Sequence, residues 1–218
     1  MVLLLLTCVG CGQPMSLVDT SNPRAAETTS LWWFMLSLGL ATYILTLTLL
    51  ALALRASPVS RLQLSERGRH FVLVGCGILA PVVILTALLV ADLRTLVSVT
   101  VAAEPDLVVE VVGHQFWWEV RYPDQGLATA NVVHLPVGRR VLLRLISADV
   151  IHSFWVPRLA GKTDLNPGLV TTTWLHAAQP GLYRGQCAEY CGTAHAHMFL
   201  ALHADPPADF STWLDEQQ

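Results

Sequence analysis

Charged residues are scarce in this chain of 218 residues, because Asp, Glu, Lys and Arg together make up only 13% of it. An ordinary soluble domain carries about 25%. So few charges exclude a disordered chain, and they exclude a protein that binds nucleic acid through a basic surface. Hydrophobic residues reach 53%, which is too many for a simple soluble domain. The positions of these apolar residues therefore decide which class of protein the sequence encodes.

Two long segments contain no charged residue at all, residues 31–54 and residues 71–91. A helix rises about 1.5 Å per residue, so each segment is long enough to cross a hydrocarbon core of about 30 Å. A buried core helix is the alternative for each run, but core helices are usually shorter. Pro81 is compatible with a membrane helix. The sequence therefore predicts a hairpin of two transmembrane helices.

The segment between the two runs, residues 55–70, is basic and contains four arginines against a single acid, Glu66. Short cytoplasmic loops carry an excess of Arg and Lys. We therefore expect this loop in the cytoplasm and both chain ends on the periplasmic side of a bacterial inner membrane. Asp92 and Arg94 then mark the outer end of the second helix. A chance bias of charge is the alternative.

The first residues of the chain resemble a bacterial lipoprotein signal. Residues 1–11 place an apolar run before small residues and a cysteine, so we expect cleavage after Gly10 and acylation of Cys11. No Lys or Arg precedes the apolar run, and a plain signal peptide or an uncleaved tail is the alternative. Residues 12–30 are then a polar tether that leads to the first helix.

Residues 95–218 have the pattern of an all-β domain on the outer side. Stretches rich in β-branched and aromatic residues alternate with Gly and Pro turns, which is typical of a sandwich or barrel. The stretches are residues 99–123, 130–147 (two strands around a Pro-Val-Gly turn), 168–177, 181–187 and 197–204, and a terminal helix is expected within 206–218. Seven basic and twelve acidic side chains give the domain a net charge of −5. We expect this charge to attract a basic partner, and an ordinary solvated surface is the alternative.

The strongest chemical signal lies at residues 185–198, GQCAEYCGTAHAHM. The candidate metal ligands of this segment are Cys187, Cys191, His195 and Met198, at spacings of four, four and three, and His152 lies upstream in an apolar context. Soft sulfur donors together with imidazole select copper. The residue types therefore predict a copper site.

Two cysteines allow more than the single copper of a blue-copper site, which uses one Cys, two His and a weak axial Met. The two sulfurs can bridge two copper ions, each of which then takes one histidine and one weaker ligand. Met198 supplies one weaker ligand, and the backbone carbonyl of Glu189 is the best source of the other. A rigid centre of this kind is suited to electron transfer rather than to substrate turnover.

Other interpretations of this cluster stay open at the level of sequence. Cys187 and Cys191 are close enough for a disulfide, which an oxidising compartment permits. Two Cys and two His can bind zinc, although Met is a poor zinc ligand and zinc-finger spacing is absent. His197 is near enough to compete as a ligand. We expect structural roles for the remaining histidines of the outer domain, which are His114, His134, His176 and His203.

Three segments in chain order resemble subunit II of the haem–copper cytochrome c oxidases, bacterial aa3-like branch. They are GHQFWWEV (113–120), DVIHSFWVPRLAGKTDLNPG (149–168) and GQCAEYCGTAHAHM (185–198), and the resemblance spans about residues 31–205. It implies a cupredoxin-like Greek-key β-sandwich after the membrane helices. It also implies a binuclear copper centre, CuA, whose ligands here are His152, Cys187, the carbonyl of Glu189, Cys191, His195 and Met198.

The resemblance further implies a role in respiration. A soluble or membrane-bound cytochrome c would pass electrons to CuA, and CuA would pass them to haem in subunit I, where oxygen is reduced to water and protons are pumped. Subunit III and membrane lipid are further implied partners, nucleic acid is not, and the chain has no independent active site. The Glu189 side chain would point toward a magnesium ion shared with subunit I, near Asp164.

The sequence departs from this family where electrons arrive. The family usually has Trp after GHQ, whereas this chain has Phe116, followed by Trp117 and Trp118. These three aromatic residues are nevertheless the expected electron-input residues, and Asp124 and Asp149 are the expected docking acids. The second apolar run also lacks the carboxylate that many relatives use for proton uptake.

Several related functions are alternatives. Quinol oxidase subunits lack the copper ligands, and fused oxidases carry a C-x-x-C-H haem site that this sequence does not contain, so we expect a separate cytochrome c as donor. The chain could instead serve a nitric oxide reductase. It could also be a membrane-tethered copper-binding module without a redox partner, or an interaction domain held together by a disulfide.

Overall fold

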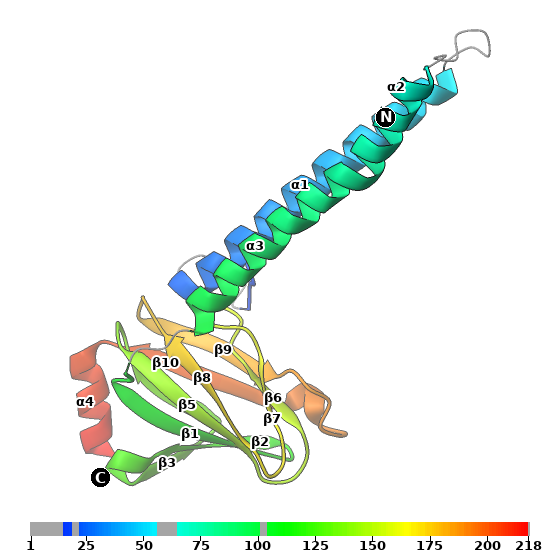
Figure 1. Ribbon diagram of the computed structural model, residues 1–218. Coiled ribbons are helices and arrows are strands. Elements are labelled where there is room, and N and C mark those ends of the chain that lie inside the picture. The colour runs from blue at the N-terminus through cyan, green and yellow to red at the C-terminus, as the bar shows by residue number, and fades with distance from the viewer. Residues whose placement is uncertain (1–14, 19–21, 56–64, 101–103, 218) are drawn as a thin grey trace, which may run out of the picture. The chain divides into compact units, whose positions relative to one another are not determined.

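The computed structural model describes residues 15–18, 22–55, 65–100 and 104–217 (Figure 1). The chain divides into two compact units, one formed by Ser30–Thr100 and the other by Met1–Thr29 together with Val101–Gln218. The first unit contains most of two long helices, and the second contains the β-domain. The signal-like segment 1–11 with Cys11 lies outside the described residues and stays a prediction.

Two helices are long and apolar enough to cross a membrane, Ala25–Arg55 and Glu66–Val97. The first lies within α1 (Pro23–Arg55). The second runs through α2 (Glu66–Val74), a π-helical turn (Gly75–Leu79) and α3 (Ala80–Thr100). Their apolar windows are 0% buried within the chain, so these surfaces are free to face lipid or other proteins. The two predicted long helices are therefore present.

Both helices extend beyond the apolar runs that predicted them. α1 begins at Pro23, inside the predicted tether, and α2 begins at Glu66, inside the predicted loop. α3 continues to Thr100, so Asp92 and Arg94 do not mark a helix end, and residues 95–100 are helical rather than part of the β-domain. The length of an apolar run predicts only the part of a helix that can lie in the hydrocarbon core. The residues at which the helix begins and ends depend on capping. Pro23 occupies the first helical position, which proline favours.

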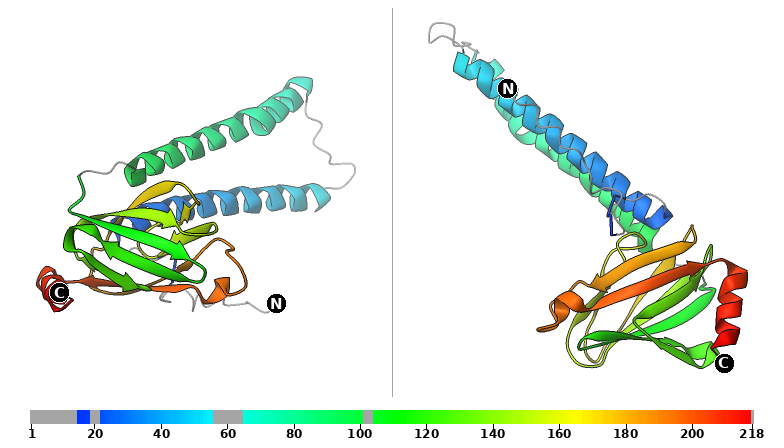
Figure 2. Two further views of the ribbon diagram at one scale, coloured as in Figure 1. Left: turned by 90° about the horizontal axis from the view of Figure 1, so that it is seen from below. Right: turned by 180° about the vertical axis from the view of Figure 1, so that it is seen from behind.

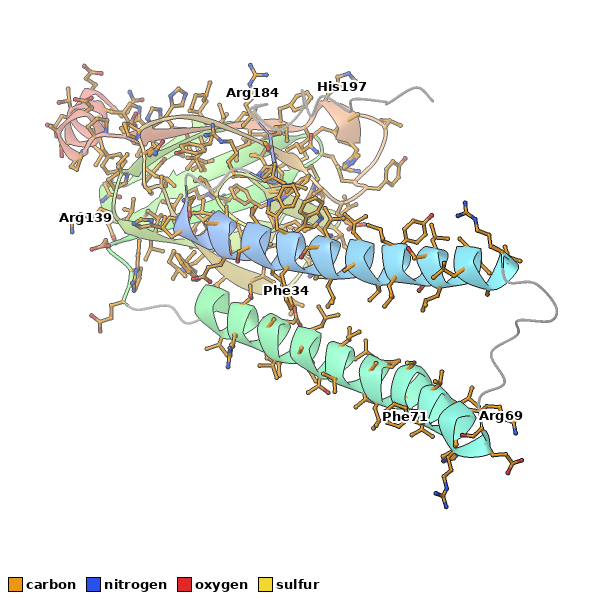
Figure 3. The ribbon with its side chains drawn as sticks, turned by 90° about the horizontal axis from the view of Figure 1, so that it is seen from above. Phe34, Arg69, Phe71, Arg139, Arg184 and His197 are labelled. Carbon is orange, nitrogen blue, oxygen red and sulfur yellow. The ribbon has the colours of Figure 1, made fainter. Side chains whose placement is uncertain are left out.

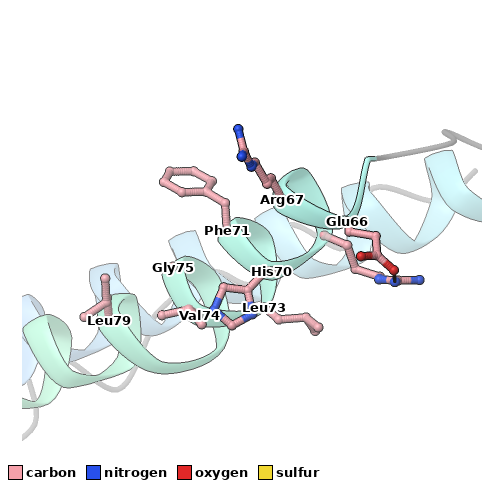
Figure 4. Close-up of a pocket in the computed structure, with 9 residues that line it drawn as sticks. Glu66, Arg67, His70, Phe71, Leu73, Val74, Gly75 and Leu79 are labelled. Carbon is pink, nitrogen blue, oxygen red and sulfur yellow. Dashed lines mark ion pairs between the residues drawn. The ribbon is translucent and has the colours of Figure 1, made fainter.

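The second helix changes from basic to apolar within its first turns (Figure 4). Arg69 lies 3.6 Å from Glu66 at the charged end, and Phe71 follows on an exposed apolar stretch. The π-helical turn Gly75–Leu79 directly precedes α3, whose second residue is Pro81. Proline lacks an N–H and collides with the carbonyl four residues earlier in a regular α-helix, and a locally wider turn relieves that conflict. The helix therefore continues through a proline.

The β-domain is a sandwich of two five-stranded sheets (Figures 1 and 2), which confirms the predicted fold class. The first sheet has the order β3-β2-β1-β5-β8 and consists of β1 (Leu107–His114), β2 (Trp117–Tyr122), β3 (Leu127–Ala130), β5 (Arg140–Ser147) and β8 (Val170–His176). The second has the order β4-β10-β9-β6-β7 and consists of β4 (Val132–Pro136), β6 (His152–Trp155), β7 (Thr163–Leu165), β9 (Gly181–Cys187) and β10 (Phe199–Asp205). The predicted terminal helix is α4 (Pro207–Glu216).

Alternating apolar residues of both sheets form the core. Along β5, Val141, Leu143 and Leu145 are buried, because successive side chains of a strand point to opposite faces. The two strands predicted around the Pro-Val-Gly turn are β4 and β5, but they do not pair with each other. Gly138, at φ 75°, lies in the turn that carries the chain from one sheet to the other. β5 therefore joins the first sheet, whereas β4 pairs with β10 in the second.

Candidate metal centre

The six predicted ligand positions come from two adjacent strands and one loop. His152 begins β6, and Cys187 ends β9, which pairs with β6 in the same sheet. Cys191 and His195 lie in the loop after β9, and Met198 immediately precedes β10. The N–H of Cys187 donates to the carbonyl of Met198 at 3.0 Å, so the two ends of the loop are held together.

The structure brings all six donors close together. The Sγ atoms of Cys187 and Cys191 are 3.9 Å apart. The Nδ1 of His152 lies 3.9 Å from the Cys187 sulfur, and the Nδ1 of His195 lies 3.7 Å from the Cys191 sulfur. The Met198 Sδ is 3.8 Å from the Cys191 sulfur, and the carbonyl oxygen of Glu189 is 3.2 Å from the Cys187 sulfur.

The two cysteines are free thiols rather than a disulfide. Their separation of 3.9 Å is far from the roughly 2.05 Å of an S–S bond. The disulfide alternative is therefore wrong for the described structure. The donor atoms of His152, Cys187 and Cys191 all lie within 4.8 Å of one another, so these three residues could hold a metal ion. His197 is exposed and outside this group.

Burial differs across the cluster. His152 is 0% exposed, and Cys187, Cys191 and Met198 are also buried. His195 is half-buried, and the neighbouring Tyr190 is exposed with its ring 5.8 Å from the His195 ring. The sulfur atoms are thus shielded from water, whereas one histidine reaches toward the surface.

Asp149 contacts the imidazole of His152 at Nε2, the ring nitrogen that does not face the Cys187 sulfur. Its Oδ1 lies 2.7 Å from the His152 Nε2, and its other oxygen accepts from the N–H of Gln115 at 2.7 Å. Burial raises the pKa of Asp149, but the hydrogen bonds from His152 and from the backbone of Val150 and Gln115 outweigh it and lower the pKa overall. A carboxylate here favours the tautomer with its proton on Nε2, which leaves Nδ1 free as a ligand. Asp149, the predicted docking acid, thus holds His152 in place while its side chain stays 31% exposed.

The two thiols differ in acidity. Burial raises the pKa of the Cys187 thiol, but hydrogen bonds from His152, from the backbone of Glu189 and Ser153 and from His195 outweigh burial and lower it overall. For Cys191, burial and the adjacent Cys187 sulfur both raise the pKa. One thiolate forms readily, but a second beside it is opposed by like charge. A bound cation would remove that opposition, so the pair fits a metal site.

The end of β1 packs closely against His152, and the loop that follows β1 packs against the cysteine loop. A Cβ at Gly113 would lie 2.9 Å from the His152 ring, and a Cβ at Gly192 would lie 3.0 Å from the Phe116 ring. The Nε2 of Gln115 donates to the carbonyl of Cys191 at 2.6 Å. The sequence predicted no supporting role for Gly113 or Gln115. Their position in the GHQF motif was the available signal.

The three aromatic residues predicted for electron input lie in different surroundings. Phe116 is half-buried against Gly192 of the cysteine loop. Trp117 is 37% exposed and stacks on His114 with ring centroids 4.5 Å apart. Trp118 is fully buried, with its ring centroid 6.0 Å from that of His152. Strand alternation separates Trp117 from Trp118, so only Phe116 and Trp117 reach the surface.

The carboxylates of Glu189 and Asp164 come together, as predicted, but around a lysine. The Nζ of Lys162 lies 3.2 Å from Asp164 Oδ1 and 3.2 Å from Glu189 Oε2. This pairing satisfies both acids within the chain. The second predicted docking acid, Asp124, lies in the short helix Pro123–Gln125 after β2. It is therefore at the opposite end of that strand from Trp117.

Comparisons with known proteins agree with this architecture. Residues 125–204 match the family model described as the periplasmic domain of cytochrome c oxidase subunit II. Cytochrome c oxidase subunit 2 of Alkalihalophilus pseudofirmus is 43% identical over 107 residues, which cover 49% of this chain and 31% of that protein. The subunit 2 of Thermostichus vulcanus is 46% identical over 114 residues, which cover 52% of this chain and 34% of that protein.

A solved structure is similar as well. The periplasmic domain of subunit II of cytochrome oxidase from Bradyrhizobium japonicum matches with a TM-score of 0.52 and 29% identity, over 54% of this chain and 96% of that domain. The similarity thus covers the β-domain. The matched segments span only about a third of the two curated relatives, 31% and 34% of their lengths.

Proposed function

Because the β-domain of this chain belongs to the family of cytochrome c oxidase subunit II periplasmic domains, we propose that the protein is the electron-accepting subunit of a membrane-bound cytochrome c oxidase. We further propose that it holds a binuclear CuA centre. The observation that carries this proposal is the pair of free cysteine sulfurs 3.9 Å apart, flanked by two imidazole Nδ1 atoms at 3.9 and 3.7 Å.

The donor set fits copper better than zinc. The sulfurs of Cys187 and Cys191 and the imidazoles of His152 and His195 would hold the copper ions. Met198 and the carbonyl of Glu189 would be the weaker ligands. Thiolate, imidazole and thioether together are soft donors that select copper, whereas structural zinc sites use four Cys or His ligands. When bound, such a centre supplies transfer of one electron at a time.

The chain's own residues would keep the centre rigid and dry. Asp149 holds the proton of His152 on Nε2, at 2.7 Å. Gln115 anchors the cysteine loop through the carbonyl of Cys191. The buried sulfur atoms exclude water from the ligands. A centre held this firmly changes little in geometry between oxidation states, which suits electron transfer.

The membrane arrangement is part of the same proposal. Residues 31–54 and 71–91 would cross the bacterial inner membrane, with the basic loop 55–70 in the cytoplasm and the β-domain, which begins with β1 at Leu107, in the periplasm. Electrons from a cytochrome c would pass through this subunit to haem in subunit I, where oxygen would be reduced and protons pumped. The Glu189 and Asp164 carboxylates would face subunit I, and a magnesium ion there would have to replace Lys162 between them.

Copper analysis and electron paramagnetic resonance of the full chain in detergent test the assignment. We expect two copper ions per chain and a mixed-valence binuclear spectrum, which Cys187→Ser should abolish. Cys76→Ser is the matched control, because Cys76 is an exposed thiol on the second helix outside the site. A single copper, zinc, or no metal would contradict the proposal. Consumption of oxygen rather than nitric oxide by the assembled complex would separate an oxidase from a nitric oxide reductase.

A further inference from the structure

A groove of about 570 Å³ runs along one face of α3, where Phe34 of α1 also borders it. We call it the Arg94 groove and define it by Phe34, Val83, Thr86, Ala87, Val90 and Arg94. The α3 residues of this set recur every three or four positions, so they share one face of that helix. Figure 3 shows Phe34 on α1, on the side where that helix faces α3.

Apolar and small side chains line the groove as far as Arg94. Phe34 and Val90 are 43% and 41% exposed, and Val83 is 67% exposed, so the described residues leave the groove open. Ala87 carries only a methyl group and leaves room between Val83 and Val90. Such a lining favours a hydrocarbon chain, which packs against these side chains through van der Waals contacts.

Arg94 has apolar neighbours instead of a charged partner. α3 continues for six residues beyond it, to Thr100, and the nearby Leu96 and Val97 are 51% and 59% exposed. Asp92 lies on another face of the helix, because residues two positions apart do not face each other. No carboxylate in the described part of the chain forms an ion pair with Arg94.

In the proposed membrane arrangement, Arg94 lies at the periplasmic end of the second helix. Arginines gather at the cytoplasmic ends of membrane helices, and this helix follows that rule with Arg67 and Arg69 near its start. Arg94 is the exception. A charge within a membrane-spanning segment is costly unless it is paired. Since the described residues offer Arg94 no partner, it requires an anion from outside the chain.

A phospholipid supplies both an anion and a hydrocarbon chain. Its phosphate lies at the boundary of the hydrocarbon core, and the long aliphatic stem of an arginine can reach that boundary from an apolar surface. The planar guanidinium matches a phosphate through two parallel hydrogen bonds. A carboxylate on a neighbouring membrane helix is less favourable, because it would place a second charge in apolar surroundings.

We propose that the Arg94 groove binds one phospholipid of the outer leaflet, with its phosphate paired to Arg94 and one acyl chain along Val83, Ala87 and Val90. This inference rests on the membrane arrangement proposed above. The lipid would contact both helices, because Phe34 of α1 borders the same groove. The second helix thus carries a ligand site of its own, separate from the metal centre of the β-domain.

Native mass spectrometry of the delipidated full chain in detergent tests this site. The probes are dioleoylphosphatidylglycerol, dioleoylglycerol, which lacks the phosphate, and glycerophosphoglycerol, which lacks the acyl chains. We expect the phospholipid to bind, dioleoylglycerol to bind weakly, and glycerophosphoglycerol not to compete. Arg94→Gln should lower the affinity for the phospholipid about tenfold, because it removes the charge-assisted hydrogen bonds to the phosphate.

Arg139→Gln is the matched control for the charge, because it neutralises an arginine of the β-domain (Figure 3) whose side chain is 59% exposed. It should leave the affinity unchanged. Val90→Trp tests the apolar part, since it fills the groove and keeps Arg94, and it should also weaken binding. Val72→Trp is its control near the other end of the same helix, where Val72 is 44% exposed. Circular dichroism checks that each variant keeps its helices.

The outcomes separate this inference from the proposed function. If Arg94→Gln and Arg139→Gln bind the phospholipid equally well, or if dioleoylglycerol binds as tightly as the phospholipid, the lipid site is wrong and the proposed function stands. Unchanged lipid affinity of Arg94→Gln, together with loss of the other oxidase subunits from that variant, would assign Arg94 to a partner carboxylate and overturn the lipid site. Recovery of the chain in the soluble fraction would overturn both the lipid site and the proposed membrane arrangement.

Discussion

A single carboxylate determines how His152 is presented to the candidate metal centre. Asp149 lies 2.7 Å from the Nε2 of that histidine and takes a second hydrogen bond from the backbone of Gln115. Its geometry is that of a positioning residue, whereas its place in the sequence suggested a surface acid for docking. Its side chain is also 31% exposed, so the docking role stays a prediction.

We expect Asp149→Ala to lower the copper affinity of the full chain about 10- to 100-fold, because the imidazole of His152 loses the group that sets its tautomer and orientation. Competition with a copper chelator measures this affinity. Asp149→Asn should restore part of it, since an amide oxygen can still accept from Nε2. Asp124→Ala removes an exposed acid at the far end of β2 and should have no effect. Equal affinities for all three variants would refute the positioning role.

Gly113 matters for the space that it leaves open. An added Cβ would meet the His152 ring at 2.9 Å, which is closer than side chains normally approach. We expect Gly113→Ala to cost about 1–3 kcal/mol of stability, as overpacked sites do, and to alter the copper spectrum by moving His152. Gly161→Ala is the control, because nothing lies within 4 Å of its Cβ position. Denaturant unfolding and electron paramagnetic resonance measure the two effects, and a wild-type spectrum for Gly113→Ala would count against the packing argument.

At the scale of elements, α4 closes the end of the sandwich away from the metal centre. Trp213 of α4 stacks on His134 at 4.1 Å between ring centroids and meets the Tyr122 ring at 5.3 Å. The hydroxyl of Tyr122 accepts from the N–H of His134 at 2.7 Å and thereby ties β2 to β4. Asp205 of β10 binds the same histidine at 2.7 Å. The helix thus contacts strands of both sheets through two aromatic contacts of Trp213.

Trp213→Ala should destabilise the β-domain by about 2 kcal/mol, because it removes two aromatic contacts and the apolar area that they bury. Near-ultraviolet circular dichroism during urea unfolding of the full chain would measure the loss. The copper spectrum should not change, since α4 lies at the other end of β2 from Trp117. Ser211→Ala, on the exposed side of α4, serves as the control. A change in the copper spectrum of Trp213→Ala would show that the two ends of the domain are coupled.

At the scale of the whole molecule, the charge of the chain is divided by position. The loop expected in the cytoplasm is basic and the β-domain is acidic. Acids of that domain lie both in α4 and beside the cysteine loop, where Glu189 and Asp164 share Lys162. The overall charge of −3 therefore averages over regions of opposite sign.

The proposed membrane orientation predicts which positions react with a membrane-impermeant maleimide in intact spheroplasts. Ser211→Cys, in α4 of the β-domain, should be labelled above the level of the Cys76→Ser parent chain. Ser65→Cys, at the start of the second helix, should be labelled only after the membrane is opened, because the arginines around it keep that end in the cytoplasm. The reverse pattern would invert the orientation.

The sequence by itself determined the two long apolar helices, the β-sandwich class and the ligand types of the metal centre. These depend on local information: helix length against membrane thickness, strand and turn composition, and the spacing of Cys187, Cys191, His195 and Met198 within one loop. Only the tertiary structure decided that Asp149 holds His152, that Asp124 lies far from Trp117, and that Gln115 anchors the cysteine loop. These facts depend on which strands become neighbours, and contacts between residues distant in the chain leave no periodic pattern from which to predict them.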